Sequence, residues 1–195
     1  MPEDDLPAPR RVTCTMGVSL DGFVADAEGS IAWGAPDDEV FASAVDEIRC
    51  VGVYLLGRRL YEMMTYWEDV DPATEPDPLR RECSALWQAL PKVVFSRTLT
   101  SVRGRSRLAT GSVVDEVARL RAEPGEGDVA IGGPTLMAQA AAAGLVDEYR
   151  LRVHPVLLGG GLPLFPHDRR RVDLELVASR AFTSVVVFSR YREVR

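Results

Sequence analysis

The order of the apolar segments along the chain constrains its fold more than any other feature. Up to residue 144, short apolar runs that end at glycine or turn residues alternate with amphipathic stretches, which predicts strands alternating with helices. Three strand-like segments then follow one another at 147–159, 172–182 and 184–194, with no helical pattern between them. This order predicts an α/β fold in which a mixed, mostly parallel sheet is closed along one edge by antiparallel C-terminal strands.

Local signals place the individual elements in the first part of the chain. A strand opens the segment 11–25, and further strands are predicted at 52–57, 92–96 and 128–133. Helices are predicted at 36–52, 58–64, 79–90, 112–122 and 134–144. Ser112 is the expected N-cap of the fourth helix, while Pro134 opens the fifth and Gly144 follows its end.

Length and composition suit a single domain. The chain has 195 residues, of which 46% are hydrophobic, and this is enough for one core. The acidic, proline-rich start predicts a loose tail over residues 1–10, followed by one domain over 11–195. The formal net charge of −6, without a long run of either sign, argues against a nucleic-acid surface.

Cysteine usage and hydropathy bear on metal content and compartment. The three cysteines are far apart without a Cys-x-x-Cys motif, and the chain has only two histidines, His154 and His167. We therefore expect neither a disulfide framework nor a metal site. Three observations favour a cytoplasmic protein. The cysteines are expected to be reduced thiols, and the N-terminus is unlike a signal peptide. No apolar run approaches the roughly 20 residues that are needed to span a bilayer.

Three predicted strand ends carry residues suited to binding a ligand. They are Gly57-Arg58-Arg59, Ser96-Arg97-Thr98 and Gly132-Gly133-Pro134-Thr135. In an open α/β sheet, ligands bind beyond the carboxyl ends of the strands, where helix N-termini present backbone N–H groups. Each motif alone is typical of a tight turn or a solvated loop. Together they offer phosphate donors and a backbone that a ligand can approach, although the G-x-G-x-x-G fingerprint of the usual Rossmann site is absent.

Four motifs in this order match a known family. They are SLDGFVAD, YLLGRRLYE, VVFSRTL and IGGPTLMAQAAAAGLVDEYRLRVHPVLLGGGLPLF, and the match extends over nearly the whole chain, residues 11–192. The chain resembles the dihydrofolate-reductase-like proteins, and among them the branch related to the reductase domain of bacterial riboflavin biosynthesis. The resemblance implies a three-layer fold and an NADPH-dependent reductase. It specifies the substrate much less, because this branch is broad.

The resemblance also implies which residues hold the cofactor. The amides of Arg59 and Leu60 would meet the pyrophosphate, with Gly57 allowing close approach and Arg58 supplying charge. The residues expected to hold the adenosine ribose and its 2′-phosphate are Ser96, Arg97 and Thr98. An NAD-selective site would place an acidic residue there, and none occurs between residues 92 and 112, so the sequence itself also favours NADPH.

The nicotinamide end of the site is implied in the same way. Met16 and Gly17 would contact the carboxamide through their backbone, under the loop SLDGFVADAEGSIAW. The double glycine typically approaches the cofactor through a cis peptide, so the resemblance implies a cis bond at Gly132–Gly133, which costs about 3–4 kcal/mol and must be enforced by its surroundings. Beyond this bond, Pro134 would begin a helix while Thr135 and Leu136 complete the phosphate cradle.

Asp38 is the candidate catalytic residue. The segment AWGAPDDEVF resembles the reductase segment in which a tryptophan leads to a proline and then to the substrate-binding carboxylate, and counting along it places Asp38 at that carboxylate. A partly buried carboxylate there could bind an N–C–N edge of the substrate and support proton delivery. Alternatively, Asp37, Asp38 and Glu39 only favour the N-terminus of the helix.

Other polar and aromatic residues have structural interpretations. Asp21 is interpreted as a turn former rather than a catalytic group, and His154, which precedes Pro155 in a predicted strand, as structural. The aromatic residues Trp33, Tyr66 and Trp67 line either the substrate cavity or the core.

These observations together predict a reductase that transfers a hydride from NADPH to a C=N or C=O bond of a small heterocycle of pterin or pyrimidine type. The alternative is a non-catalytic module that binds NADPH or another nucleotide. The apolar strands of the last third have no helices to cover them, which leaves an exposed edge or face. Because related riboflavin-pathway reductases form homodimers through such strands, we also expect a homodimer, with residues 147 to 192 contributing most of the contact.

Overall fold

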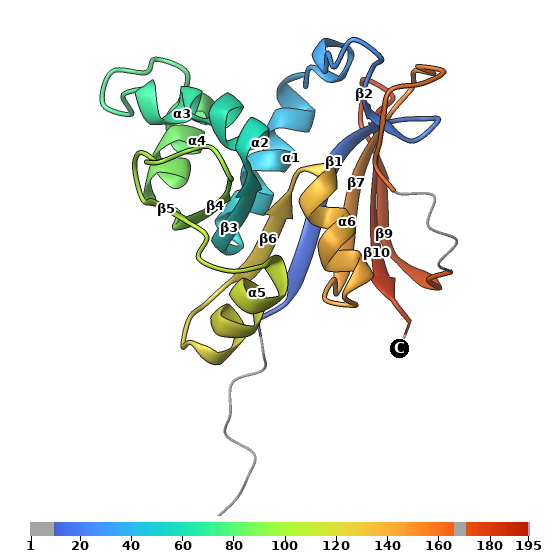
Figure 1. The fold of residues 1–195 in the computed structure, drawn as a ribbon. Helices are drawn as coiled ribbons and strands as arrows, with labels where there is room; N and C mark the ends of the chain where they lie inside the picture. Colours follow the sequence, from blue (N-terminus) through green and yellow to red (C-terminus); the bar gives the residue numbers. More distant parts are fainter. Residues whose placement is uncertain (1–9, 166–170, 195) are drawn as a thin grey trace, which may run out of the picture.

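An eight-stranded sheet forms the centre of the molecule, which a computed structural model describes for residues 10–165 and 171–194 (Figure 1). The strand order is β5-β4-β3-β6-β1-β7-β10-β9. The bounds are β1 Val12–Ser19, β3 Val51–Gly57, β4 Lys92–Phe95, β5 Ser106–Leu108, β6 Asp128–Gly132, β7 Glu148–His154, β9 Leu174–Ala181 and β10 Val187–Glu193. The tail predicted for residues 1–10 lies outside the described residues except for Arg10, as does His167.

The sheet is mixed, as predicted. All neighbouring strands from β5 to β7 pair in parallel, whereas β10 is antiparallel to both β7 and β9. The predicted segment 147–159 stops being a strand at His154, because Pro155 has no N–H for the ladder. A turn divides the segment 11–25, so that β2 (Phe23–Ala25) leaves the main sheet and pairs with β8 (Leu162–Pro163).

Helices cover both faces of the sheet, which gives the three layers (Figure 1). On one side lie α1 Asp38–Arg49, α2 Arg58–Met64, α3 Tyr66–Asp69 and α4 Pro78–Ala89, and on the other lie α5 Val113–Ala122 and α6 Pro134–Ala142. A 3₁₀ turn at Ala32–Gly34 leads towards α1. The fold class predicted from the sequence is therefore confirmed.

Each face of the sheet has its own hydrophobic cluster. On β3, Leu55 belongs to the cluster under α5 and α6, and the next residue, Leu56, belongs to the cluster under α2 and α4. Both side chains are fully buried. A central parallel strand covered on both sides cannot alternate apolar with polar residues, which explains the unbroken apolar run before Gly57.

The C-terminal strands form the exposed edge of the sheet. β9 pairs only with β10 among the described strands, and most of its residues are exposed. Leu174 and Leu176, which lie opposite Glu193 and Tyr191 of β10, are 40% and 58% exposed. An uncovered edge strand with apolar side chains is normally protected by a partner. This exposure is consistent with the expected homodimer, which remains a prediction.

We therefore expect light scattering at micromolar concentration to give twice the chain mass of 21.4 kDa. Leu176→Lys should shift the protein towards the monomer, because a charge would be buried without a partner in the interface. Val114→Lys, at a position of α5 that is 43% exposed, serves as the control and should leave the mass unchanged. A mass of 21.4 kDa for the unaltered protein would contradict the dimer.

Candidate active site

The sheet opens between β1 and β6 at the carboxyl ends of these two strands. β1 pairs with β6 only over Val12–Cys14, whereas it pairs with β7 from Thr13 to Ser19. The helix that follows β1, α1, lies on one face of the sheet, and the helix that follows β6, α6, lies on the other (Figure 1). Such a switch point between neighbouring parallel strands is where open α/β sheets bind their ligands.

The strand register brings the three predicted motifs together beside this opening. Gly57 of β3 lies opposite Phe95 of β4, the residue before Ser96, and Leu56 of β3 lies opposite Gly132 of β6. The motifs therefore follow one another on β4, β3 and β6, and Met16 and Gly17 of β1 lie across the opening. Four strands at about 4.8 Å spacing extend over roughly 14 Å, which suits an extended dinucleotide.

Two helices that begin at this edge lack a capping side chain. α1, α4 and α5 start at Asp37, Asp77 and Ser112, whose side chains accept hydrogen bonds from the first turn. By contrast, α2 and α6 have glycine N-caps, Gly57 and Gly133, without such a bond. The amides of the first turn need a partner from elsewhere. For α2 and α6 these amides include those of the predicted phosphate-binding residues Arg59, Leu60, Thr135 and Leu136.

The two glycines of the IGG turn have different functions. Gly133 has φ +94° and ψ 131°, a conformation that L side chains rarely adopt, and a Cβ added there would meet nothing within 4 Å. A Cβ on Gly132 would lie 2.8 Å from Cε1 of Tyr54 and closer still to Cδ2 of Leu60. Gly132 is thus required by packing inside the protein, while Gly133 turns the chain and leaves open space before α6.

The predicted cis peptide at Gly132–Gly133 is wrong. The described residues contain no cis peptide bond. The positive φ of Gly133 makes the turn from β6 into α6 with a trans bond, so the chain reverses direction without the cost of a cis bond. Gly57 resembles Gly133 in one respect, because a Cβ added to it would also meet nothing within 4 Å.

The loop after β4 forms a fixed turn that presents an arginine. The Ser96 hydroxyl accepts hydrogen bonds from the amides of Thr98 and Leu99, at 3.1 and 2.9 Å. The Arg97 side chain is exposed, and within the described chain it has no ion-pair partner. Arg58 differs, because its guanidinium is 3.2 Å from Glu62 one turn further along α2. Arg97 is therefore the freer of the two predicted phosphate-binding arginines.

The start of α1 separates two neighbouring carboxylates. Asp37 is the N-cap and accepts a hydrogen bond from the amide of Val40 at 2.9 Å. Asp38 is the first helical residue and is exposed, not partly buried as expected. Because Asp37 caps the helix, Asp38 remains available for another function.

An aromatic pair lies one turn further along α1. Phe41 stacks on Trp67 of α3, with ring centroids 5.6 Å apart, and the two rings form an aromatic wall between these helices.

Asp21 links the loop that follows β1 to the segment at residues 158–159 through hydrogen bonds. Its carboxylate accepts hydrogen bonds from the Ser19 hydroxyl and the Gly159 amide, both at 2.7 Å, and from the Leu158 amide at 3.1 Å. The bond from Ser19 contributes most to lowering the pKa of Asp21, and the two amides lower it further. The geometry agrees with the prediction of a turn-forming rather than a catalytic aspartate.

His154, which is interpreted from the sequence as structural, lies beside Gly17 of β1. It is 6% exposed at the end of β7, opposite Ser19 of β1, and the edge of its ring meets Trp33 at a centroid distance of 5.6 Å. A lone histidine before a proline carries no local signal for this position. The nearest hint in the sequence is that Gly17 and Gly34, which border the ring, lack side chains.

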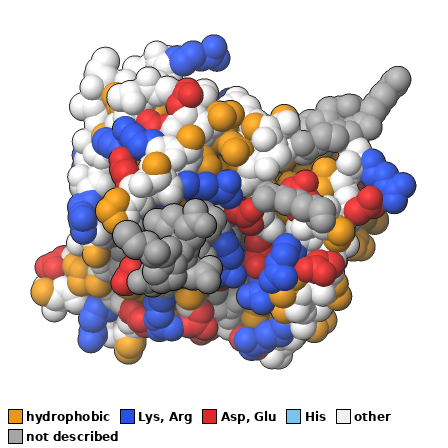
Figure 2. Space-filling model, turned by 90° about the horizontal axis from the view of Figure 1, so that it is seen from below, with side chains coloured by type: hydrophobic (Ala, Val, Ile, Leu, Met, Phe, Trp, Pro, Cys, Tyr) orange, Lys and Arg blue, Asp and Glu red, His pale blue; other side chains and the backbone are white. Residues whose placement is uncertain are grey.

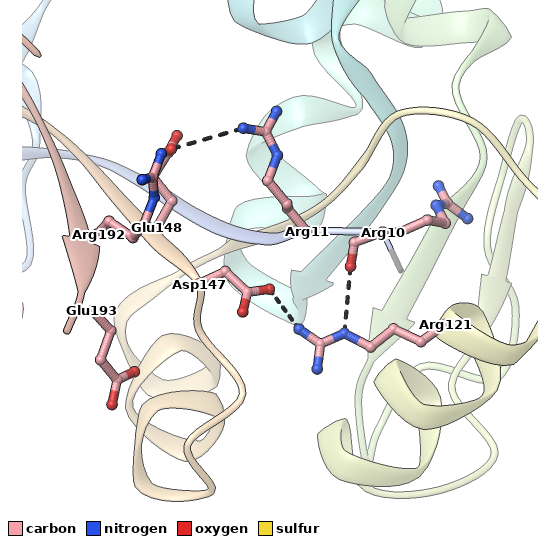
Figure 3. Close-up of a pocket in the computed structure, with 7 residues that line it drawn as sticks. All are labelled: Arg10, Arg11, Arg121, Asp147, Glu148, Arg192 and Glu193. Atoms are coloured by element: carbon pink, nitrogen blue, oxygen red, sulfur yellow. Dashed lines mark hydrogen bonds and ion pairs between the residues drawn. The ribbon is translucent and has the colours of Figure 1, made fainter. Parts of the chain in front are cut away.

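The opposite end of the molecule carries a different pocket. Figure 2 shows this end, where arginine and carboxylate side chains lie next to one another. A hollow of about 370 Å³ there is lined by Arg10, Arg11, Arg121, Asp147, Glu148, Arg192 and Glu193 (Figure 3). Its charges pair across the hollow, as Arg121 does with Asp147 and Arg11 with Glu148. It lies at the amino ends of β1 and β7, away from the glycine turns.

Neither a cluster of metal-ligating side chains nor a membrane-spanning helix occurs in the described residues. Over 10–165 and 171–194, no three His, Cys, Asp or Glu side chains gather as a metal site would require. No helix in the same residues is both long enough and apolar enough to cross a bilayer.

The sheet order and the opening between β1 and β6 define a dihydrofolate-reductase-like α/β protein. In agreement, the fold is similar to that of a dihydrofolate reductase from Enterococcus faecalis solved with NADP(H), with a TM-score of 0.60. The two are 15% identical, and the similarity covers 95% of this chain and 97% of the reductase. This likeness concerns the fold.

Within that class, the RibD C-terminal domain model matches residues 10–188, so the chain belongs to this family of reductase-like domains. It is 32% identical to the uncharacterized protein YyaP of Bacillus subtilis (strain 168) over 178 residues, which cover 91% of this chain and 92% of YyaP. A protein from Shewanella sp. PV-4 that is provisionally assigned to riboflavin biosynthesis has a similar crystal structure. The TM-score is 0.75 and the identity 25%, with 95% of this chain and 99% of that chain covered.

Proposed function

We propose that the protein is an NADPH-dependent reductase that transfers a hydride to a C=N or C=O bond of a small heterocycle of pterin or pyrimidine type. The observation that carries the proposal is the pair of glycine-capped helices, α2 and α6, which start at the ends of the neighbouring strands β3 and β6, next to the opening between β6 and β1. Membership of a reductase-like family supports the same activity.

The chain offers a place for each part of the cofactor. The first-turn amides of α2 and α6 would hold the phosphates, and the open space before Gly133 leaves room for close approach. Ser96, Arg97 and Thr98 would hold the 2′-phosphate, and the backbone of Met16 and Gly17 would orient the nicotinamide. When bound, NADPH would supply the hydride.

The chain also offers a place for the substrate. The aromatic wall of Phe41 and Trp67 would stack against a planar ring, and Asp38 at the start of the same helix would bind its N–C–N edge. Orientation of the two reactants and exclusion of water are what these residues would contribute to the rate.

Oxidation of NADPH in the presence of a panel of pterins and pyrimidines tests the activity. We expect loss of NADPH absorbance with at least one compound and none with NADPH alone. Tight NADPH binding without turnover of any compound would favour the alternative, a nucleotide-binding module. Absence of NADPH binding would contradict both.

Arg97→Ala should weaken NADPH binding about tenfold to hundredfold, because each charge-assisted hydrogen bond to the 2′-phosphate contributes about 1.5–3 kcal/mol and 1.4 kcal/mol is tenfold. NADH lacks this phosphate, so its affinity should change little in the same variant. The unaltered protein should accordingly prefer NADPH. Fluorescence titration with both nucleotides measures this. Arg81→Ala, which removes an exposed arginine from α4, is the control. Equal affinities of the unaltered protein for the two nucleotides would contradict the assignment of Arg97.

A further inference from the structure

The ring of His154 lies beside two glycines, Gly17 and Gly34. A Cβ on Gly17 would lie 3.5 Å from Nε2 of His154, and one on Gly34 would lie 3.7 Å from the same atom. Gly17 belongs to β1, where the nicotinamide is expected, and Gly34 lies four residues before Asp38. The ring nitrogen therefore points to the region that joins the expected cofactor and substrate positions.

The imidazole has a fixed orientation but no polar partner. Trp33 holds the ring edge-to-face, at an interplanar angle of 89°. Within residues 10–165 and 171–194, neither ring nitrogen has a hydrogen-bond partner, although the residue is only 6% exposed. Buried polar groups in proteins are nearly always hydrogen-bonded. The ring nitrogens of His154 are not among the fully enclosed side-chain atoms that lack a partner, so they face accessible space in which a polar ligand atom could bond them.

Burial, assisted by one neighbouring charge, favours the neutral form of the ring. Burial lowers the pKa of His154 below its ordinary value, and Arg152 on the same strand lowers it further. Asp37 at the start of α1 opposes this with a smaller effect. Arg152 is itself held by Glu47 of α1 at 3.0 Å. A neutral imidazole has one donor and one acceptor nitrogen, which matches the alternating N–H and C=O groups at the edge of a pyrimidine or pterin ring.

We propose that His154 is a substrate-contacting residue, which hydrogen-bonds an N–H or C=O group of the heterocycle bound beside Gly17. The proposal rests on the proposed function, because it presupposes a heterocycle in that site. It adds a second polar contact to that of Asp38, from a different element, because His154 ends β7 and Asp38 begins α1. Two fixed contacts would orient the ring and distinguish heterocycles by the groups along their edges.

The test is nuclear magnetic resonance of the histidine ring nitrogens, whose signals shift when a ligand bonds to them. Because the chain has two histidines, a ¹H–¹⁵N spectrum of the imidazoles contains two sets of signals, and His167→Gln assigns them. The probes are pterin and 5,6-diaminouracil, each added to the protein saturated with NADP⁺. We expect the His154 nitrogen signals to shift with at least one probe and those of His167 to stay. His154→Gln and His154→Leu should weaken that probe about tenfold or more, while NADP⁺ affinity, which also reports an intact fold, changes little.

The outcomes separate this proposal from the function on which it rests. Failure of NADP⁺ to bind the unaltered protein would overturn the proposed function, and the assignment of His154 with it. Binding of NADP⁺ but of neither probe would overturn the assignment alone. So would a probe that binds without shifting the His154 signals, or that binds both variants as tightly as the unaltered protein. The unaltered protein supplies the spectroscopic result, so a poorly folding variant does not remove the test.

Discussion

Asp38→Asn is expected to lower turnover about hundredfold or more, because a group that assists proton transfer contributes roughly 10²–10⁴ to the rate. The amide keeps the shape of the side chain but loses the charge that would bind the N–C–N edge. NADPH affinity should stay within a fewfold change, since Asp38 starts α1 whereas the expected cofactor residues lie at the ends of β1, β3, β4 and β6. Steady-state turnover and nucleotide titration of the same preparation measure the two quantities.

The neighbouring structure separates this result from a change in helix stability. Asp37, not Asp38, accepts the capping hydrogen bond of α1, so Asp38→Asn should alter stability by only a few tenths of a kcal/mol. Asp46→Asn removes a charge from the exposed last part of the same helix and should leave turnover unchanged. An unaltered turnover rate in Asp38→Asn would contradict a catalytic function of Asp38. The carboxylate would then only stabilise the N-terminus of α1, which is the alternative that the sequence allows.

Local signals were sufficient for most of the secondary structure. Ser112 caps α5 as predicted, with Asp115 completing a capping box, and Pro134 opens α6. These signals act within one turn of a helix, so a single sequence contains them completely. The two-residue strand β8 was missed because its partner β2 is more than a hundred residues away in the chain, and neither has a pattern long enough to read.

The arrangement of the candidate site depends on pairings that no local signal encodes. Each glycine motif is recognisable as a strand end, but their alignment on β4, β3 and β6 follows from the register of Gly57 with Phe95 and of Leu56 with Gly132. The family resemblance supplied this arrangement before the structure did. It also carried over the cis peptide, which the structure replaces with the positive φ of Gly133. The surroundings of His154 could not be predicted for the same reason, since Gly17, Gly34 and Trp33 approach it only in the folded chain.

Gly133→Ala is expected to weaken NADPH binding about hundredfold. The added methyl group would enter the open space before α6 and move a phosphate away from the amides of Thr135 and Leu136. Loss of two charge-assisted hydrogen bonds at about 1.5 kcal/mol each amounts to roughly 3 kcal/mol, or a hundredfold in affinity. Isothermal titration with NADPH measures the change.

The alanine at position 133 also strains the backbone, and this strain must be separated from the loss of NADPH affinity. Gly144→Ala, at the other end of α6, is the control. Gly144 follows α6 with φ +65°, and a Cβ added to it would also meet nothing within 4 Å. Alanine is strained at a positive φ in both positions, and more so at Gly133, whose ψ of 131° lies outside the left-handed α region. Thermal unfolding of both variants measures the strain and should show the larger destabilisation in Gly133→Ala. Only Gly133→Ala should lose NADPH affinity, because only its methyl group lies in front of the α6 amides. Equal loss of affinity in both variants would mean that strain in α6, and not blocked access to its N-terminus, governs binding.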